Sequence, residues 1–449
     1  MNNRRLNTAI FIFVALVYLT GQILIGTYHP DEHRFDFDSP SDVDFLYYGA
    51  IINSLFNDIP PANPAYAGVK LTQPYLQFIP AAILAKLVNP YNAIRILNLV
   101  YLVLFGILFI RFFPQRFGLA AAILFLSSSF GSQINAAGID FIGRGFTHVP
   151  FFILIAITLY GKRSLWKGLS IFAAALINGY LMIILMVFLL VDFLSVRKKE
   201  SLYYILAGVL GLLAASAIVS SETVNKPFYF LFSESFYFDP KAVLIHAVPF
   251  LIMAIFLKER RMTALLLVSI IFGSLIHYNP FFPIFMIYYS GAMLLANGEI
   301  RRPKGSIIVG IIVAVMVLGF FIEAYRKYDP GRMNYYPRDD SRLQAALEWA
   351  GNHTDDDECF MALTADADDL ALLMQYRPVY LGYIGHVSHL GLPWKERYNL
   401  TMVTFQTGRA PEIVDYIFYG PVERKYFPGF NTTLKIAYRD NFVTIYRTR

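Results

Sequence analysis

Long apolar runs separated by short polar links dominate the first 320 or so residues of the chain. They predict helices near residues 9–26, 72–88, 93–112, 117–132, 149–160, 168–195, 202–220, 241–257, 263–278, 280–296 and 306–323, because about 20 apolar residues are needed to cross a bilayer as a helix. The 168–195 run is long enough for two half-length helices broken at Asn178-Gly179. The pattern predicts a mostly α-helical, polytopic transmembrane bundle of about 10 to 12 spans.

Two polar regions interrupt this pattern. The first, residues 29–71, carries seven acids against Arg34 and Lys70. The second, residues 324–449, has the texture of a small α/β domain. It predicts a helix from Ser341 to Asn352 and strands near 359–363, 379–381, 416–419 and 442–446. We therefore expect a transmembrane module at 1–323, with the acidic loop 29–71, followed by a soluble domain at 324–449.

Composition supports a membrane protein. Hydrophobic residues make up 56% of the 449 residues and charged residues 16%, whereas about a quarter of the residues of a soluble domain are charged. The net charge of +6 fits basic cytoplasmic links better than a nucleic-acid-binding groove, which would need a clustered basic face. The single cysteine, Cys359, excludes an intrachain disulfide framework.

The basic links predict the topology. Arg197-Lys198-Lys199, Lys258 to Arg261 and Arg301 to Lys304 alternate with links poor in positive charge, which places them in the cytoplasm. We take 9–26 as a retained span with a cytoplasmic N-terminus, so loop 29–71 and residues 324–449 are extracytoplasmic. The sequons at Asn352, Asn399 and Asn431 all lie in the last 126 residues and agree with this placement.

Short motifs carry a resemblance to a known family. Ser41-Asp42-Val43-Asp44-Phe45, then Ile59-Pro60-Pro61-Ala62-Asn63-Pro64-Ala65-Tyr66-Ala67-Gly68 and Leu71-Thr72-Gln73-Pro74-Tyr75-Leu76, resemble the first external loop of GT-C superfamily membrane glycosyltransferases, in particular a poorly characterised prokaryotic branch. The stretches 376–386, 415–424 and 443–447 are similar to the soluble domain that ends many of these proteins. Relatives often have Tyr-His where this chain has Gln73-Pro74.

The resemblance implies an inverting transfer of a hexosyl or pentosyl group. The donor would be a dolichyl- or polyprenyl-phosphate-linked sugar and the acceptor an extracytoplasmic glycan, lipid or protein, with no nucleic acid involved. An acid of the first external loop would serve as general base, and a metal would often be unnecessary. Such chemistry needs a carboxylate to take the acceptor's proton and donors or cations for the leaving phosphate.

Asp42 is the carboxylate that matches the family motif, and Asp44 is the second candidate. Asp42 directly precedes a helix-like stretch that runs to Asn53, so N-capping is the alternative role. The acidic pairs Asp36/Asp38 and Asp42/Asp44 offer oxygen ligands for a divalent cation; the alternative is a solvated acidic loop. No residue is assigned to a metal.

Polar residues within or beside the apolar runs are candidates for substrate binding, because they are costly in a bilayer. The link 138–148 holds Asp140, Arg144 and His148, where Arg144 could bind phosphate as a forked donor and Asp140 could orient it; a structural ion pair is the alternative. His277 lies in an external link, and Arg326 follows the last span. In the tail, Arg377, His386, His389 and Arg397 share the stretch most similar to the family and are candidates for acceptor contact; a structural role for each is the alternative.

Two other function classes stay open. A transporter or flippase for a lipid-linked sugar would share the spans, but it would more often show two similar halves, and none are visible in the sequence. A receptor or assembly protein with an external sensing domain is the other, and it would need neither the acidic loop nor the charges within the membrane region. A non-catalytic relative of the enzymes is a further alternative.

Overall fold

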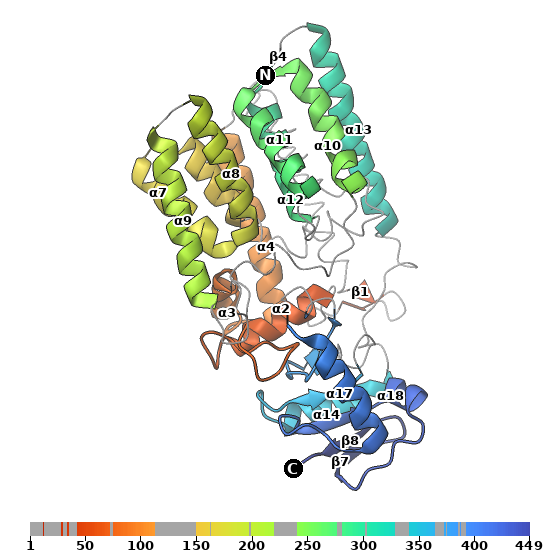
Figure 1. The fold of residues 1–449 in the computed structure, drawn as a ribbon. Coiled ribbons are helices and arrows are strands. Elements are labelled where there is room, and N and C mark those ends of the chain that lie inside the picture. Colours follow the sequence, from red (N-terminus) through yellow and green to blue (C-terminus); the bar gives the residue numbers. More distant parts are fainter. Residues whose placement is uncertain are drawn as a thin grey trace. The chain divides into compact units, whose positions relative to one another are not determined.

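The computed structural model describes residues 12, 28–29, 34–35, 43–71, 75–112, 150–161, 163–196, 199–219, 240–275, 281–300, 303–327, 341–363, 372–373, 375–384, 387 and 392–449. The described chain is mostly helical, with a four-stranded sheet near its C-terminal end (Figure 1), which confirms the predicted fold class at that level. It forms two compact units. Unit 1 comprises Met1–Ile25, Arg95–Ile218 and Leu231–Met333; unit 2 comprises Gly26–Ile94, Val219–Phe230 and Asn334–Arg449.

The helices of unit 1 follow the predicted apolar runs closely. They are α4 (Pro90–Phe112, shared with unit 2), the helix Pro150–Tyr160, α7 (Ser164–Ile177), α8 (Gly179–Val196), α9 (Lys199–Val219), α10 (Pro240–Phe256), α11 (Arg260–Leu275), α12 (Phe281–Asn297) and α13 (Pro303–Lys327). The run at 168–195 is two helices, because Asn178 adopts an extended backbone (φ −146°, ψ 95°) that ends α7. The predicted spans 9–26, except Ile12, and 117–132 lie outside the described residues.

One predicted span is wrong in extent. The described part of this range, residues 75–88, contains a 3₁₀ turn, η1 (Leu76–Phe78), and the six-residue helix α3 (Ile79–Leu84). At 1.5 Å per residue a helix of this length cannot cross a bilayer. The segment belongs to unit 2.

Aromatic and small residues bring the helices of unit 1 together. Helices α10, α11 and α12 pack on one another, α13 packs on α10, and α8 packs on α11 (Figure 1). Phe152 stacks on Tyr289 with ring centroids 4.9 Å apart. On α9, a Cβ added at Gly211 would lie 2.7 Å from Ala175 Cβ and 2.7 Å from the Phe172 carbonyl oxygen of α7. Glycine is therefore required for α9 to approach α7 this closely.

The faces of these helices that point away from their neighbours are also apolar. Exposed large hydrophobic side chains follow one another at helical spacing on several of them, as Leu202, Leu206, Leu210 and Leu213 on α9, Leu244, Ile245, Val248, Ile252 and Ile255 on α10, and Ile307, Ile311, Val315 and Leu318 on α13. A helix that is hydrophobic all round is typical of a membrane span. Two described helices are long and apolar enough to cross a bilayer: α4, over Pro90–Leu108, and α9, over Glu200–Ile218. Five other described helices are apolar but shorter.

Unit 2 is built around the sheet β5-β6-β8-β7. Its strands are β5 (Phe360–Met361), β6 (Tyr416–Tyr419), β7 (Lys435–Arg439) and β8 (Thr444–Arg447). Strands β5 and β6 are parallel, and β8 is antiparallel to both β6 and β7. Helices α14 (Ser341–His353), α17 (Trp394–Thr407) and α18 (Pro421–Tyr426) complete the C-terminal part.

Helix α2 (Val43–Ser54) is part of the same core. Ala50 of α2 is buried in one hydrophobic cluster with α14, β5, β6 and β8, including Leu347, Phe360, Phe418 and Ile445. The loop therefore folds with the tail rather than with the helical module to which the sequence assigned it. Within the loop, β1 (Tyr28–His29) pairs with β2 (Arg34–Phe35).

Candidate functional site

The acidic loop passes into α2 at the position of the predicted base. Helix α2 begins at Val43, so Asp42 directly precedes its first residue and Asp44 lies in its first turn. Asp42 lies outside the described residues, and Asp44 is described only as part of the helix. The next turns are buried, with Phe45, Leu46 and Ile51 each exposed by 2% or less. The helix that follows Asp42 is thus fixed in the core of unit 2.

The loop after α2 is hydrogen-bonded back onto that helix. The Ala62 amide donates to Ser54 Oγ over 2.8 Å, and the Tyr47 hydroxyl donates to Asn63 Oδ1 over 3.5 Å. Asn63 Oδ1 also accepts from the Ala65 amide over 3.1 Å. Asn63 is fully buried, and its Nδ2 has no hydrogen-bond partner among the described groups.

The same loop adds itself to the edge of the C-terminal sheet. Val379 pairs with Phe360 of β5 in parallel, and residues 64–67 run beside 379–382. The Val379 amide donates to the Pro64 carbonyl (2.9 Å), the Ala67 amide to the Val379 carbonyl (3.0 Å) and the Gly382 amide to the Ala65 carbonyl (2.8 Å). Loop and tail, more than 300 residues apart in sequence, therefore form one continuous backbone ladder.

Arg397 of α17 fastens this junction. Its guanidinium carbon lies 3.5 Å from the ring centroid of Tyr66 and 4.6 Å from that of Tyr380. Nη2 donates to the Ala67 carbonyl over 2.8 Å and Nη1 to the Tyr380 carbonyl over 2.5 Å. Burial raises the pKa of Tyr66 and of Tyr380, and the charge of Arg397 partly offsets that rise. Burial lowers the pKa of Arg397.

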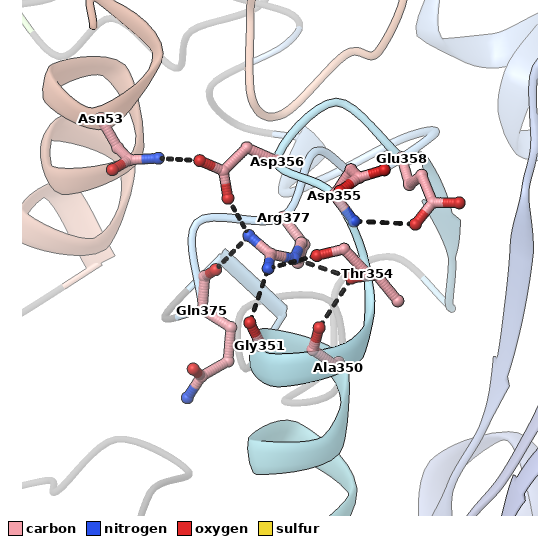
Figure 2. Close-up of polar contacts among 9 residues, drawn as sticks. All are labelled: Asn53, Ala350, Gly351, Thr354, Asp355, Asp356, Glu358, Gln375 and Arg377. Atoms are coloured by element: carbon pink, nitrogen blue, oxygen red, sulfur yellow. Dashed lines mark hydrogen bonds and ion pairs between the residues drawn. The ribbon is translucent and has the colours of Figure 1, made fainter.

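Arg377, predicted to contact the acceptor, is engaged within unit 2 (Figure 2). Its Nη2 donates to the carbonyls of Gly351 and Thr354 over 2.8 Å each, at the C-terminal end of α14, and its Nε donates to Thr354 Oγ1 over 2.8 Å. Its Nη1 bonds the Asp356 carboxylate and the Gln375 carbonyl. Arg377 is 4% exposed. These contacts explain Arg377 as a helix cap, and a substrate contact stays a prediction.

The other predicted residues of the site are not described in a way that tests them. Asp140, Arg144, His148, His277 and His386 lie outside the described residues, as do the acidic pair members Asp36 and Asp38. Arg326 is described only as part of α13. Among the described residues, no three His, Cys, Asp or Glu side chains are close enough to hold a metal ion.

Two buried polar clusters in unit 1 were missed at the sequence level. Asp192 of α8, 3% exposed, accepts from Arg261 Nε (2.9 Å) and Nη2 (2.8 Å) and from Ser201 Oγ (3.2 Å). His246 Nδ1 of α10 lies 3.1 Å from the Tyr288 hydroxyl of α12, and both are buried. Each was signalled by an ionisable residue inside an apolar run.

The Asp192 cluster marks one end of unit 1. There the link before α11 pairs with the link before α13, as β3 (Leu257–Lys258) with β4 (Glu299–Ile300). Arg261 ties the end of α8 to the same place, and Asn297 Nδ2 donates to the Tyr160 hydroxyl over 2.8 Å. The described residues in or beside the three basic links therefore lie at one end of the bundle.

Comparison with known proteins shows which known fold the chain has. No protein-family model and no curated protein matches the sequence. Two solved structures of ArnT from Cupriavidus metallidurans are similar in fold. The one bound to undecaprenyl phosphate has a TM-score of 0.57 at 11% identity, and the apo state 0.56 at 12%; each comparison covers 98% of both chains. The chain therefore has the ArnT fold over almost its entire length.

Proposed function

We propose that the chain is a polytopic membrane glycosyltransferase. It transfers a sugar from a polyprenyl-phosphate-linked donor to an extracytoplasmic acceptor, with inversion at the anomeric carbon. The observation that carries this proposal is the fold shared over 98% of both chains with ArnT bound to undecaprenyl phosphate, a GT-C glycosyltransferase. The external-loop motifs of the sequence support the same family.

The surface of unit 1 supports embedding in a bilayer. Exposed apolar faces on α9, α10 and α13 would be an aggregation liability in water and are favourable in lipid. The end of the bundle that holds Lys258 and Arg261 fits a cytoplasmic face, because the sequence has its basic links there. Helix α13 leaves that end at Pro303, so the chain that follows it would start on the extracytoplasmic side.

The proposed chemistry uses few groups. The Asp42 carboxylate accepts the proton of the acceptor hydroxyl as its oxygen attacks the anomeric carbon, and the bond from that carbon to the phosphate oxygen breaks. The polyprenyl phosphate leaves with the electron pair. Arg144, His277 and Arg326 are proposed to bind the phosphate. Asp140 and His148 are proposed to orient these phosphate-binding residues. His386 is proposed to contact the acceptor. A divalent cation held by the acidic loop is an optional addition.

Substitution of Asp42 tests the assignment. In Asp42→Asn the proton acceptor is lost while size is kept, so release of carrier phosphate should fall by roughly a hundredfold or more. Asn caps a helix about as well as Asp, so the thermal unfolding midpoint should stay unchanged. Asp44→Asn, the second candidate two residues later in the sequence, is the comparison variant. Equal rates for Asp42→Asn and wild-type protein would remove Asp42 from the mechanism, and a larger loss in Asp44→Asn would transfer the role to Asp44.

A further inference from the structure

Arg397, Tyr66, Ala67 and Tyr380 form a small cluster that we call the Arg397 clamp. The guanidinium lies between two tyrosine rings and donates to two backbone carbonyls. The Tyr66 ring and the Ala67 carbonyl belong to the external loop. The Tyr380 ring and carbonyl belong to the C-terminal domain. The clamp therefore joins two segments that the chain brings together from opposite ends of the sequence.

Arginine suits this position and lysine does not. A planar guanidinium can stack on aromatic rings and at the same time direct several N–H groups in its plane to separate acceptors. The ammonium of lysine has no plane to stack and is more strongly hydrated, so it would lose part of the contact with Tyr66 and at least one of the two carbonyl bonds. The partial burial of the cluster strengthens each of these contacts relative to an exposed one.

A continuous set of contacts leads from the clamp to α2. Ala67, held by Arg397, is also in the backbone ladder with Val379. Three residues earlier than Tyr66, Asn63 binds the Tyr47 hydroxyl of α2, and Ala62 binds Ser54 at the end of that helix. Asp42 directly precedes α2. A shift of the loop would thus be passed to the helix whose first turn follows the proposed base.

A second contact holds α2 to the same domain (Figure 2). Asn53 Nδ2 donates to Asp356 Oδ2 over 3.5 Å, and the other oxygen of Asp356 pairs with Arg377. This contact is long and Asp356 is about half exposed, so it is the weaker of the two. The clamp is the better-buried attachment between the domain and the loop.

We propose that Arg397 is a positioning residue for sugar transfer, through which the C-terminal domain holds the external loop and α2 in their working place. This inference rests on the proposed function and assigns the soluble domain a task within it. Arg397 itself is not placed in contact with the donor or the acceptor.

The test uses full-length protein in lipid nanodiscs and two measurements on each variant. Amide hydrogen exchange reports the loop, and steady-state release of carrier phosphate from lipid-linked sugars reports transfer. The variants are Arg397→Ala, Arg397→Lys and, as the matched control, Arg409→Ala. Arg409 is exposed, and its side chain makes no hydrogen bond or ion pair with the described residues.

For Arg397→Ala we expect exchange at amides 63–71 to quicken by roughly tenfold or more, with β6 and β8 unchanged. We expect kcat to fall by roughly ten- to a hundredfold, as for a misplaced catalytic group, with KM for the donor within about twofold of wild type. Arg397→Lys should be intermediate in both measurements, and Arg409→Ala should match wild type.

Each of the other outcomes contradicts one part of the proposal. Unchanged loop exchange in Arg397→Ala would show that the clamp does not hold the loop. Faster exchange with unchanged kcat would show that the loop position does not matter for transfer. If β6 and β8 also exchange faster in Arg397→Ala, the variant has lost its fold and Arg397→Lys decides. If wild-type protein transfers no sugar, the proposed function fails, while the exchange result still decides whether the clamp exists.

Discussion

The two units of the chain stabilise a buried acidic side chain in different ways. In unit 1 the Asp192 carboxylate is buried against the guanidinium of Arg261. In unit 2 the fully buried Glu423 accepts from the backbone amides of Leu363 (2.8 Å) and Gly420 (2.9 Å). Unit 1 pairs charge with charge at the end of a bundle with apolar outer faces, whereas unit 2 uses free amides at the start of α18 and beyond β5. A buried acid is thus compensated by a cation in unit 1 and by backbone amides in unit 2.

Accessibility from the two sides of the membrane is the largest expected difference between the units. Cys359, the single cysteine, is buried, and burial raises the pKa of its thiol to about 12, so wild-type protein should stay unlabelled by maleimide near neutral pH. A cysteine at exposed Gln406 in unit 2 should be labelled in intact cells, and one at exposed Arg260 at the basic end of unit 1 only after permeabilisation. Labelling in the reverse order would invert the proposed topology.

Removing the cation in unit 1 should cost the most stability. Arg261→Ala leaves the buried Asp192 without its cation and should lower the free energy of unfolding by roughly 3 kcal/mol. This is the low end for a broken buried pair, because Arg261 is partly exposed. Thermal unfolding in detergent measures this. Arg260→Ala, one residue earlier and exposed, is the control and should be nearly silent. Equal effects of the two substitutions would mean that the pair contributes nothing.

Removing the acid in unit 2 should cost slightly less. Glu423→Ala leaves the amides of Leu363 and Gly420 without their acceptor, which should destabilise unit 2 by about 2 kcal/mol. Glu423→Gln keeps one acceptor oxygen and should cost less than Glu423→Ala. Amide exchange of β5 and α18 measures this loss of stability within unit 2. A larger loss of stability in Glu423→Gln than in Glu423→Ala would contradict the explanation that the two backbone amides stabilise the buried Glu423.

The smallest predicted effect is a pH dependence confined to unit 2. Burial by itself raises the pKa of Asp440, but hydrogen bonds from the Tyr438 hydroxyl and the amides of Val443 and Phe442, with the charge of Arg424, lower it overall. A lowered folded-state pKa means that the stabilisation is present above the unfolded value of about 3.9 and is lost as pH falls through the folded value. Protection from exchange in the β7–β8 hairpin, relative to the intrinsic exchange rate at each pH, should therefore fall below about pH 4 in wild-type protein.

Asp440→Ala provides the comparison for that titration. At neutral pH it should destabilise the hairpin by about 1 kcal/mol, because three hydrogen bonds at a turn are lost. Its protection, relative to the intrinsic exchange rate, should then change much less than that of wild type as the pH falls. Parallel pH profiles for the two proteins would assign the acid sensitivity to another group.

Local patterns predicted the helical parts of the fold well. The break at Asn178 and the helix starting at Ser341 both follow from residues close in sequence. Helix α17 was missed because its buried positions are Thr401, Thr404 and Phe405, while apolar Leu400 and Val403 are exposed, so no apolar stripe marks the inner face. Strand β7 was missed because it is an edge strand with mostly exposed side chains.

The site was less predictable because its contacts are not local. The motif residues 59–68 were recognised, but their pairing with 379–382 depends on backbone groups that carry no residue signature. Arg397 was recognised only as one of several polar residues in the tail, since its partners Tyr66 and Ala67 lie about 330 residues away. Arg377 had the residue type expected for a substrate contact, yet local helix carbonyls account for its donors.

The most direct test of the proposed function is a stoichiometry. Purified wild-type protein in nanodiscs is given polyprenyl-phosphate-linked sugars, radiolabelled in the sugar, with membrane extract as acceptor, and both the carrier phosphate released and the label joined to acceptor are counted. The proposal predicts about one carrier phosphate released for each sugar joined, as a transfer with a single bond exchanged requires. Movement of intact donor across the bilayer without release would indicate a transporter, and no release from any donor tried would contradict the transferase.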